Sequence, residues 1–147
     1  MAKIAVIVGT VYGGAQYVAE QAISTLGELN YDCQLFEDAS LDAVLAFAAD
    51  IWLVISSTTG EGDIPDNVFP FYLQLKDQFP LLTNKRYAVI ALGDSSYDNF
   101  CGAGEQFNEL LAELQGTEIA PMLRIDAIET LEPELLALPW LTEHFSH

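Results

Sequence analysis

The chain has 147 residues, of which 51% are apolar, and its 22 acidic side chains outnumber 5 basic ones for a formal net charge of −17. This length suits one ordinary domain with a sizeable core, so we expect a single domain over residues 1–147. The acidic balance argues against nucleic acid and anionic membrane surfaces as partners, because both bind basic patches. It favours basic partner proteins met by electrostatic steering, although a solvated acidic surface without a specific partner would have the same composition.

Targeting and metal-binding signals are weak in this sequence. The apolar run Ile4–Val8 is too short for a signal peptide and leads into a glycine loop. No stretch approaches the roughly 18 apolar residues that span a bilayer. Cys33 and Cys101 lack the spacing of a metal or redox motif. We therefore expect a cytoplasmic, monomeric protein with two reduced thiols and no metal.

Apolar runs of the strand type alternate with helical patterns along the chain. The runs are Lys3–Val8, Cys33–Phe36, Ile51–Ser56, Arg86–Leu92 and Glu118–Ile125. Three of them are nearly continuously apolar, as in parallel strands that are buried on both faces of a sheet.

Between these runs, apolar residues recur at helical spacing. The expected helix faces are Val18, Ala22, Leu26 and Leu29; Val68, Tyr72, Leu75 and Phe79; and Phe107, Leu110, Leu111 and Leu114. Shorter helices are expected near Leu41–Ala49 and Glu134–Phe145, and Asp66 or Asn67 is expected to cap the helix after Pro65. Because parallel strands need right-handed crossovers, this alternation predicts an α/β fold with a doubly wound five-stranded parallel sheet.

Eight of the ten glycines lie in or just after three loops, and each loop follows a strand-type run. We call residues 9–15 the first loop, 57–63 the second loop and 93–101 the third loop. Glycine is tolerated where the backbone bends sharply or approaches a ligand closely. Doubly wound sheets bind ligands at the carboxyl ends of their strands. The three loops are therefore expected to form one binding site.

The first loop suits a phosphate group. Gly13 and Gly14 open a helix, and a helix N-terminus presents unpaired N–H groups and a partial positive charge. The loop has no Lys or Arg, so binding would depend on backbone amides and the Thr10 hydroxyl. A tight turn that needs glycine for structural reasons explains this loop equally well when it is taken alone. The expected contacts are Thr10, Val11, Tyr12, Gly13, Gly14 and Ala15.

The second and third loops suit the walls of a flavin ring. A peptide next to Gly60 can turn its carbonyl toward ring atom N5, because glycine carries no steric penalty at positive φ. Tyr97 is placed to stack on the ring, although a lone loop tyrosine would more often have no such role. The expected contacts are Thr58, Thr59, Gly60, Glu61 and Gly62 in the second loop, and Gly93, Asp94, Ser95, Ser96, Tyr97, Asn99, Phe100 and Cys101 in the third.

Carboxylates are concentrated around these two loops, namely Glu61, Asp63, Asp66, Asp94 and Asp98. At an effective dielectric constant of about 20, two charges about 8 Å apart interact by roughly 2 kcal/mol. Such repulsion disfavours the anionic, two-electron-reduced flavin. The three loops together therefore predict flavin mononucleotide (FMN) in a low-potential one-electron carrier, although loop solubility alone would account for Asp63 and Asp66.

The second and third loops also carry a family resemblance. With Ser57-Thr58-Thr59-Gly60-Glu61-Gly62-Asp63, Leu92-Gly93-Asp94-Ser95-Ser96-Tyr97 and the following Asn99-Phe100-Cys101, the chain resembles short-chain bacterial flavodoxins of the YqcA and MioC type. It is also similar to the flavodoxin-like domains of diflavin reductases. The resemblance covers essentially the whole chain. It implies strand order 2-1-3-4-5 and non-covalent FMN with its phosphate at Thr10–Ala15. The uninterrupted Glu118–Ile125 segment resembles the short-chain form, which lacks an insertion in the fifth strand.

Three positions depart from the family pattern. Tyr12 and Gly14 stand where the family usually has Ser or Thr, and Thr59 stands where many relatives have an aromatic residue on the inner ring face. The loss of these hydroxyls and of one stacking wall predicts weaker FMN binding.

Three functions are compatible with this sequence. The first is an electron carrier without substrate turnover of its own, loaded by an NADPH-dependent flavoprotein reductase and unloaded by an unknown acceptor enzyme. The second is a binding or regulatory module with a weakened FMN site. The third is an FMN-dependent quinone or nitro reductase, for which we find no added loop that would build a substrate shelf. A response-regulator receiver is excluded, because the ends of strands one and three lack its aspartate cluster.

Overall fold

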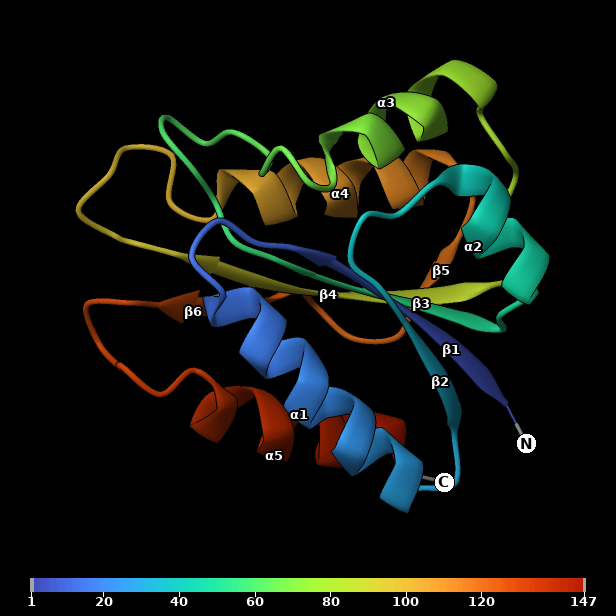
Figure 1. Ribbon diagram of the computed structural model, residues 1–147, viewed down its shortest axis with the longest axis horizontal. Helices are drawn as coiled ribbons and strands as arrows, with labels where there is room; N and C mark the ends of the chain where they lie inside the picture. Colours follow the sequence, from blue (N-terminus) through green and yellow to red (C-terminus); the bar gives the residue numbers. More distant parts are fainter. Residues whose placement is uncertain (1, 147) are drawn as a thin grey trace.

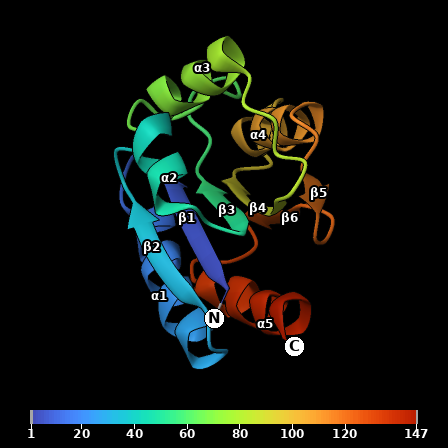
Figure 2. The ribbon, with the colours of Figure 1, turned by 90° about the vertical axis from the view of Figure 1, so that its right-hand side faces the viewer.

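The computed structural model describes residues 2–146 as three layers, with a parallel sheet between two layers of helices (Figure 1). Helices α2, α3 and α4 cover one face of the sheet, and α1 and α5 cover the other, as the rotated view in Figure 2 also shows. The strands are β1 (Lys3–Gly9), β2 (Asp32–Phe36), β3 (Ile51–Ser56), β4 (Arg86–Gly93), β5 (Thr117–Glu118) and β6 (Leu123–Asp126). The helices are α1 (Gly14–Glu28), α2 (Leu41–Phe47), α3 (Phe69–Gln78), α4 (Gly102–Glu113) and α5 (Glu134–Phe145).

The sheet has the expected doubly wound order, β2-β1-β3-β4-β5, and all its pairings are parallel. Val6 of β1 lies between Leu35 of β2 and Leu53 of β3, and Leu53 in turn faces Ala88 of β4. This confirms the predicted fold class. It also brings the carboxyl ends of β1, β3 and β4, and with them the three glycine loops, to one edge of the sheet.

The fifth position of the sheet differs from the prediction of one uninterrupted strand over Glu118–Ile125. Two short strands, β5 and β6, follow each other along β4. Tyr87 pairs with Glu118, and Ile90 pairs with Leu123, so four residues on this edge lie opposite two on β4. Pro121 lies in the break and has no N–H to donate to the ladder, which explains why the strand stops and restarts.

Both faces of the sheet are buried, as the continuous apolar runs predict. Alternate residues of the central strands point into two separate cores. The core beneath α2, α3 and α4 includes Ile7, Trp52 and Phe107, and the core beneath α1 and α5 includes Val6 and Leu53. Each of these five side chains is at most 1% exposed. The helices are therefore fixed to the sheet by apolar burial on both sides.

Two predictions about α3 are wrong. Phe79, expected on its buried face, is 47% exposed, because the helix ends at this residue in a left-handed turn with φ of 46°. Neither Asp66 nor Asn67 caps the helix; the N-cap is Val68, and no side chain caps it. Asn67 instead bonds to residues on other segments. No helix within residues 2–146 combines the length and the apolar character needed to cross a membrane.

Two helical glycines provide a matched test of the packing of α4 on β4. A Cβ at Gly104 would lie 2.3 Å from the Cβ of Ala91, whereas a Cβ at Gly27 on α1 would enter open space. Gly104→Ala is expected to lower the free energy of unfolding by about 1–3 kcal/mol, because the overlap is with a rigid β-strand residue. Gly27→Ala is expected to raise it by about 0.5–1 kcal/mol through helix propensity. Urea denaturation measures both, and equal stability of the two variants would contradict this account of the interface.

Candidate cofactor-binding site

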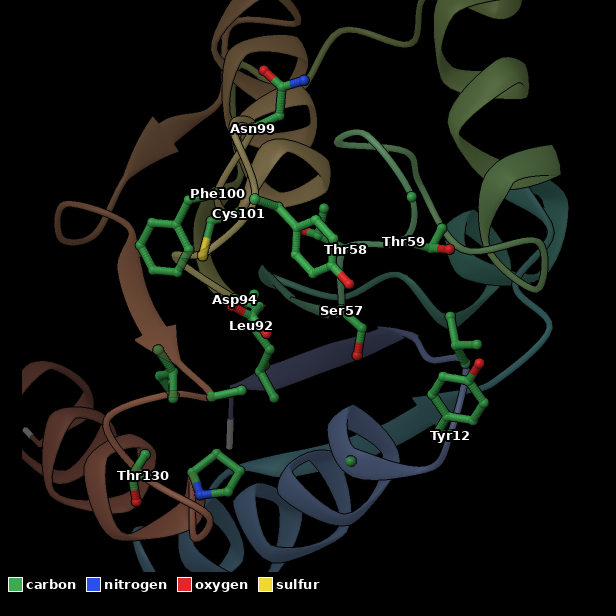
Figure 3. Close-up of a pocket in the computed structure, with 18 of the residues that line it drawn as sticks. Tyr12, Ser57, Thr58, Thr59, Leu92, Asp94, Asn99, Phe100, Cys101 and Thr130 are labelled. Carbon is green, nitrogen blue, oxygen red and sulfur yellow. The ribbon is translucent and has the colours of Figure 1, made fainter.

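A cavity of about 550 Å³ lies at the carboxyl edge of the sheet, where the three glycine loops meet (Figure 3). Tyr12 comes from the first loop, Ser57 to Thr59 from the second, and Asn99 to Cys101 from the third. The segment between β6 and α5 closes the remaining side with Thr130, Leu131 and Pro133. The topology therefore gathers four loops, far apart in the sequence, around one space.

The first loop leaves the start of α1 open to a ligand. Gly13 adopts φ of 89°, no side chain caps the helix, and its first turn holds no acidic residue. The Gly13 amide donates to the Thr10 hydroxyl at 3.0 Å, which shapes the turn. A Cβ at Gly14 would meet nothing within 4 Å, and Tyr12 is 98% exposed, so its side chain does not cover the turn. Free amides at an uncapped helix start favour an anion.

The second loop is a tight turn whose carbonyls are nearly all engaged. The Thr59 carbonyl accepts from the amides of Gly62 and Asp63, and Thr59 donates to Asp63 in return. Asn99 donates to the Glu61 carbonyl at 2.6 Å. Gly60 itself adopts φ of 53°, and no donor among the described residues is bonded to its carbonyl. The Gly60 carbonyl is therefore free to serve a ligand, the role that the sequence predicts.

The second and third loops are in direct contact. Gln106 donates to the Gly62 carbonyl at 2.8 Å, and a Cβ at Gly62 would lie 2.7 Å from that of Asn99. A Cβ at Gly102 would lie 2.8 Å from the Gly62 Cα. The glycines here serve close backbone packing, and they hold the two expected walls of the ring site at a fixed spacing.

The third loop is anchored by Asp126, the last residue of β6. Its carboxylate accepts from the amides of Ser95 at 3.1 Å and Ile128 at 3.0 Å. Hydrogen bonds from the Ser95 hydroxyl and then the Ile128 amide hold the pKa of Asp126 below its ordinary value of 3.8. Within the loop, Asp94 accepts from both the amide and the hydroxyl of Ser96. Tyr97 is 61% exposed at the rim, where a ring face is accessible for stacking.

Cys101 is a structural residue of the third loop. It is fully buried, adopts φ of 59° as the N-cap of α4, and its thiol lies 3.5 Å from the Ala91 carbonyl. Burial raises its pKa to about 11, so the thiol stays protonated at neutral pH. This agrees with the expectation of an inert thiol.

Twelve of the nineteen predicted contacts line the cavity: Val11, Tyr12, Gly14, Thr58, Thr59, Gly60, Gly93, Asp94, Tyr97, Asn99, Phe100 and Cys101. Seven lie behind or beside its wall: Thr10, Gly13, Ala15, Glu61, Gly62, Ser95 and Ser96. Seven lining residues are absent from the prediction: Ser57, Leu92, Ile125, Ala127, Thr130, Leu131 and Pro133. The segment before α5 carries no glycine, so the signal that located the other loops could not find it.

Charge is distributed unevenly along the strand direction. Lys3 and Lys85–Arg86 lie at the amino ends of β1 and β4, opposite the cavity, and Arg124 pairs with Glu105 at 2.6 Å. No basic side chain lines the cavity. Four of the acidic residues expected around the ring, Glu61, Asp63, Asp66 and Asp98, are exposed. The amino edge also carries Asp32, Asp50 and Glu118, so what distinguishes the cavity is the absence of lining basic side chains.

The fold and the site define an α/β protein that holds a nucleotide-type cofactor at the switch point of a doubly wound sheet. Residues 6–140 match the flavodoxin family model. Flavodoxin YqcA of Escherichia coli (strain K12) is 44% identical over 97% of this chain and 96% of that protein, and Protein MioC of the same strain is 39% identical over 96% and 95%. A solved C101A mutant of flavodoxin from Pseudomonas aeruginosa has a TM-score of 0.91 and 46% identity, covering 96% of this chain and 95% of that one. The chain belongs to the flavodoxin family.

Flavodoxins are electron-transfer proteins that bind FMN, accept electrons from reductases and pass them to acceptors. The residues of this site fit that cofactor. The uncapped start of α1, with open space at Gly13 and Gly14, suits a phosphate monoester. The exposed face of Tyr97 and the unengaged Gly60 carbonyl suit a planar ring with a polar edge.

The anchor of the third loop predicts a pH-dependent stability difference. Because its native pKa is lowered, Asp126 stabilises the fold above pH 3.8 and loses this contribution as the pH falls through the native value. Asp126→Asn is expected to unfold at a lower urea concentration than wild type at pH 7, and the difference is expected to narrow below pH 3.8. Asp98→Asn, at an exposed position of the same loop, is the control and should show no such pH-dependent gap. A difference in unfolding urea concentration between Asp126→Asn and wild type that stays constant with pH would contradict this role of Asp126.

Proposed function

We propose that this protein is a low-potential one-electron carrier that uses FMN and has no substrate turnover of its own. The observation that carries the proposal is the cavity at the carboxyl edge, which is lined by the uncapped helix start at Gly14, by Gly60 with its unengaged carbonyl, and by the exposed Tyr97. These three features match the phosphate, the polar ring edge and the ring face of FMN.

The first loop would hold the phosphate through backbone amides and the Thr10 hydroxyl, without a charged side chain. No cationic side chain lies in the loop or lines the cavity, so the helix dipole and the amides supply the positive potential. The ring would lie between the second and third loops, against Tyr97. Leu92 and Ile125, at the ends of β4 and β6, would form the apolar floor and exclude water.

Bound FMN would supply two successive one-electron reduction steps. The residues around it would set the difference between the two reduction potentials. The Gly60 carbonyl would accept a hydrogen bond from a protonated ring nitrogen, because the neighbouring carbonyls already have partners. Exposed carboxylates on the second and third loops disfavour additional negative charge nearby. Together these groups favour the addition of one electron with a proton over the addition of a second electron.

The distribution of charge supports docking of basic partners at the cavity end. Acidic residues are exposed there, whereas Lys3, Lys85 and Arg86 lie at the opposite edge of the sheet. A basic surface on an NADPH-dependent flavoprotein reductase, and on an acceptor enzyme, would be steered toward the edge that holds the cofactor. We further propose that the chain acts as a cytoplasmic monomer of one domain.

A reductive titration of the FMN-loaded protein, followed by visible absorption, tests this function. We expect the oxidised spectrum to pass through a distinct long-wavelength band at one electron per flavin before bleaching at two. Direct bleaching without that band would contradict the one-electron role. The purified protein without any reductase should also fail to oxidise NADPH with a quinone, and steady turnover in that control would favour a quinone reductase.

FMN titration of the apoprotein distinguishes the carrier from a module with a weakened site. The carrier predicts saturable binding of one FMN per chain, with quenching of flavin fluorescence. Absence of quenching at high micromolar protein would favour the module, for which Tyr12, Gly14 and Thr59 provide the reason.

A further inference from the structure

Asn67 lies outside the cavity, yet its side chain joins three segments of the chain. Its Oδ1 accepts from the Thr10 amide at 2.9 Å. Its Nδ2 donates to the Val8 carbonyl at 2.9 Å and also to the Glu37 carbonyl. Because one end of the amide faces an N–H and the other faces two carbonyls, only one orientation of this side chain satisfies all its partners.

These bonds decide which amides of the first loop remain available. Asn67 occupies the Thr10 amide, and the Thr10 hydroxyl occupies the Gly13 amide. Gly13 then turns at φ of 89° into α1. The loop amides for which no described residue serves as acceptor are those of Val11, Tyr12, Gly14 and Ala15.

The same segment is also fixed at its other side. Glu37, whose carbonyl accepts from Asn67, accepts from the Gln16 side chain through its carboxylate at 2.6 Å. A Cβ at Gly9 would lie 2.6 Å from a side-chain carbon of Val68, so the residue after Asn67 packs directly on the start of the loop. The first loop is therefore held by the segment that ends at Val68 as well as by its own bond between the Gly13 amide and the Thr10 hydroxyl.

We propose that Asn67 is a positioning residue for phosphate binding, which it controls by fixing Thr10 and thereby the orientation of the four free amides. The inference rests on the proposed function, because it needs FMN as the ligand. No cationic side chain in the loop compensates for misdirected amides, so the affinity for phosphate depends on the backbone geometry that Asn67 imposes. The ring site is held separately by Asn99, Gln106 and Asp126.

Comparison of FMN with riboflavin, which lacks the phosphate, isolates this role. Asn67→Ala is expected to weaken FMN binding about five- to fifty-fold, the range for loss of one or two partly buried hydrogen bonds, and to change riboflavin binding by less than about twofold. Fluorescence titration of the apoprotein with each ligand gives both dissociation constants. Asn84→Ala, at an exposed turn before β4, is the matched control and should change neither. Equal losses for both ligands, or no loss for FMN, would overturn the proposal.

Amide hydrogen exchange in the wild-type apoprotein tests the same inference without a variant. The Thr10 and Gly13 amides should be protected, whereas those of Gly14 and Ala15 should exchange fast and become protected when FMN is added. The assignment would be contradicted if the Gly14 and Ala15 amides were already protected before FMN is added. It would also be contradicted if they stayed unprotected after FMN is added.

The outcomes separate the two proposals. A wild-type protein that binds neither FMN nor riboflavin would refute the proposed function. A wild-type protein that binds FMN, with a variant that loses both ligands equally, would refute the role of Asn67 alone.

Discussion

Backbone hydrogen bonding between parallel strands stops at the carboxyl edge of the sheet, and the loops beyond that edge must be held by other groups. In this protein, four side chains do so by bonding to the backbone of a neighbouring loop. Asn67 holds the first loop, Asn99 joins the third loop to the second, Gln106 joins α4 to the second, and Asp126 holds the third. A ligand that meets mainly backbone atoms needs such supports, because its own contacts cannot select the loop conformation. The site is therefore organised before any cofactor enters it.

The four supports act at different parts of the cavity. Asn67 is connected to the uncapped start of α1 through Thr10, whereas the other three hold the loops that carry Gly60 and Tyr97. This separation fits a ligand with two chemically different ends, an anion and a planar ring. It also allows the phosphate affinity and the environment of the ring to be changed independently by substitution.

The sequence was sufficient to predict the layers of the fold, because strands buried on both faces give continuous apolar runs and the helices between them show one apolar face. Pro121 cannot donate to a strand ladder, so the sequence does contain a signal for the break in the fifth strand. The surrounding apolar run nevertheless predicts one continuous strand. Asn67 was misassigned as a helix cap, because cap preferences are local and its real partners lie 30 to 59 residues away. Leu131 and its neighbours were missed because they line the cavity without glycine, and their place depends on how β6 aligns with β4.

The placement of the lysines has a practical consequence. Lys3 and Lys85 lie at the amino ends of β1 and β4, and Lys76 is in the last turn of α3, which runs back toward that edge. Reagents that attach proteins to an electrode or sensor chip through primary amines would thus tether the molecule by the edge remote from the cavity. In a film immobilised in this way, the opening of the cavity would face the solution, and no engineered tag would be needed to orient the protein.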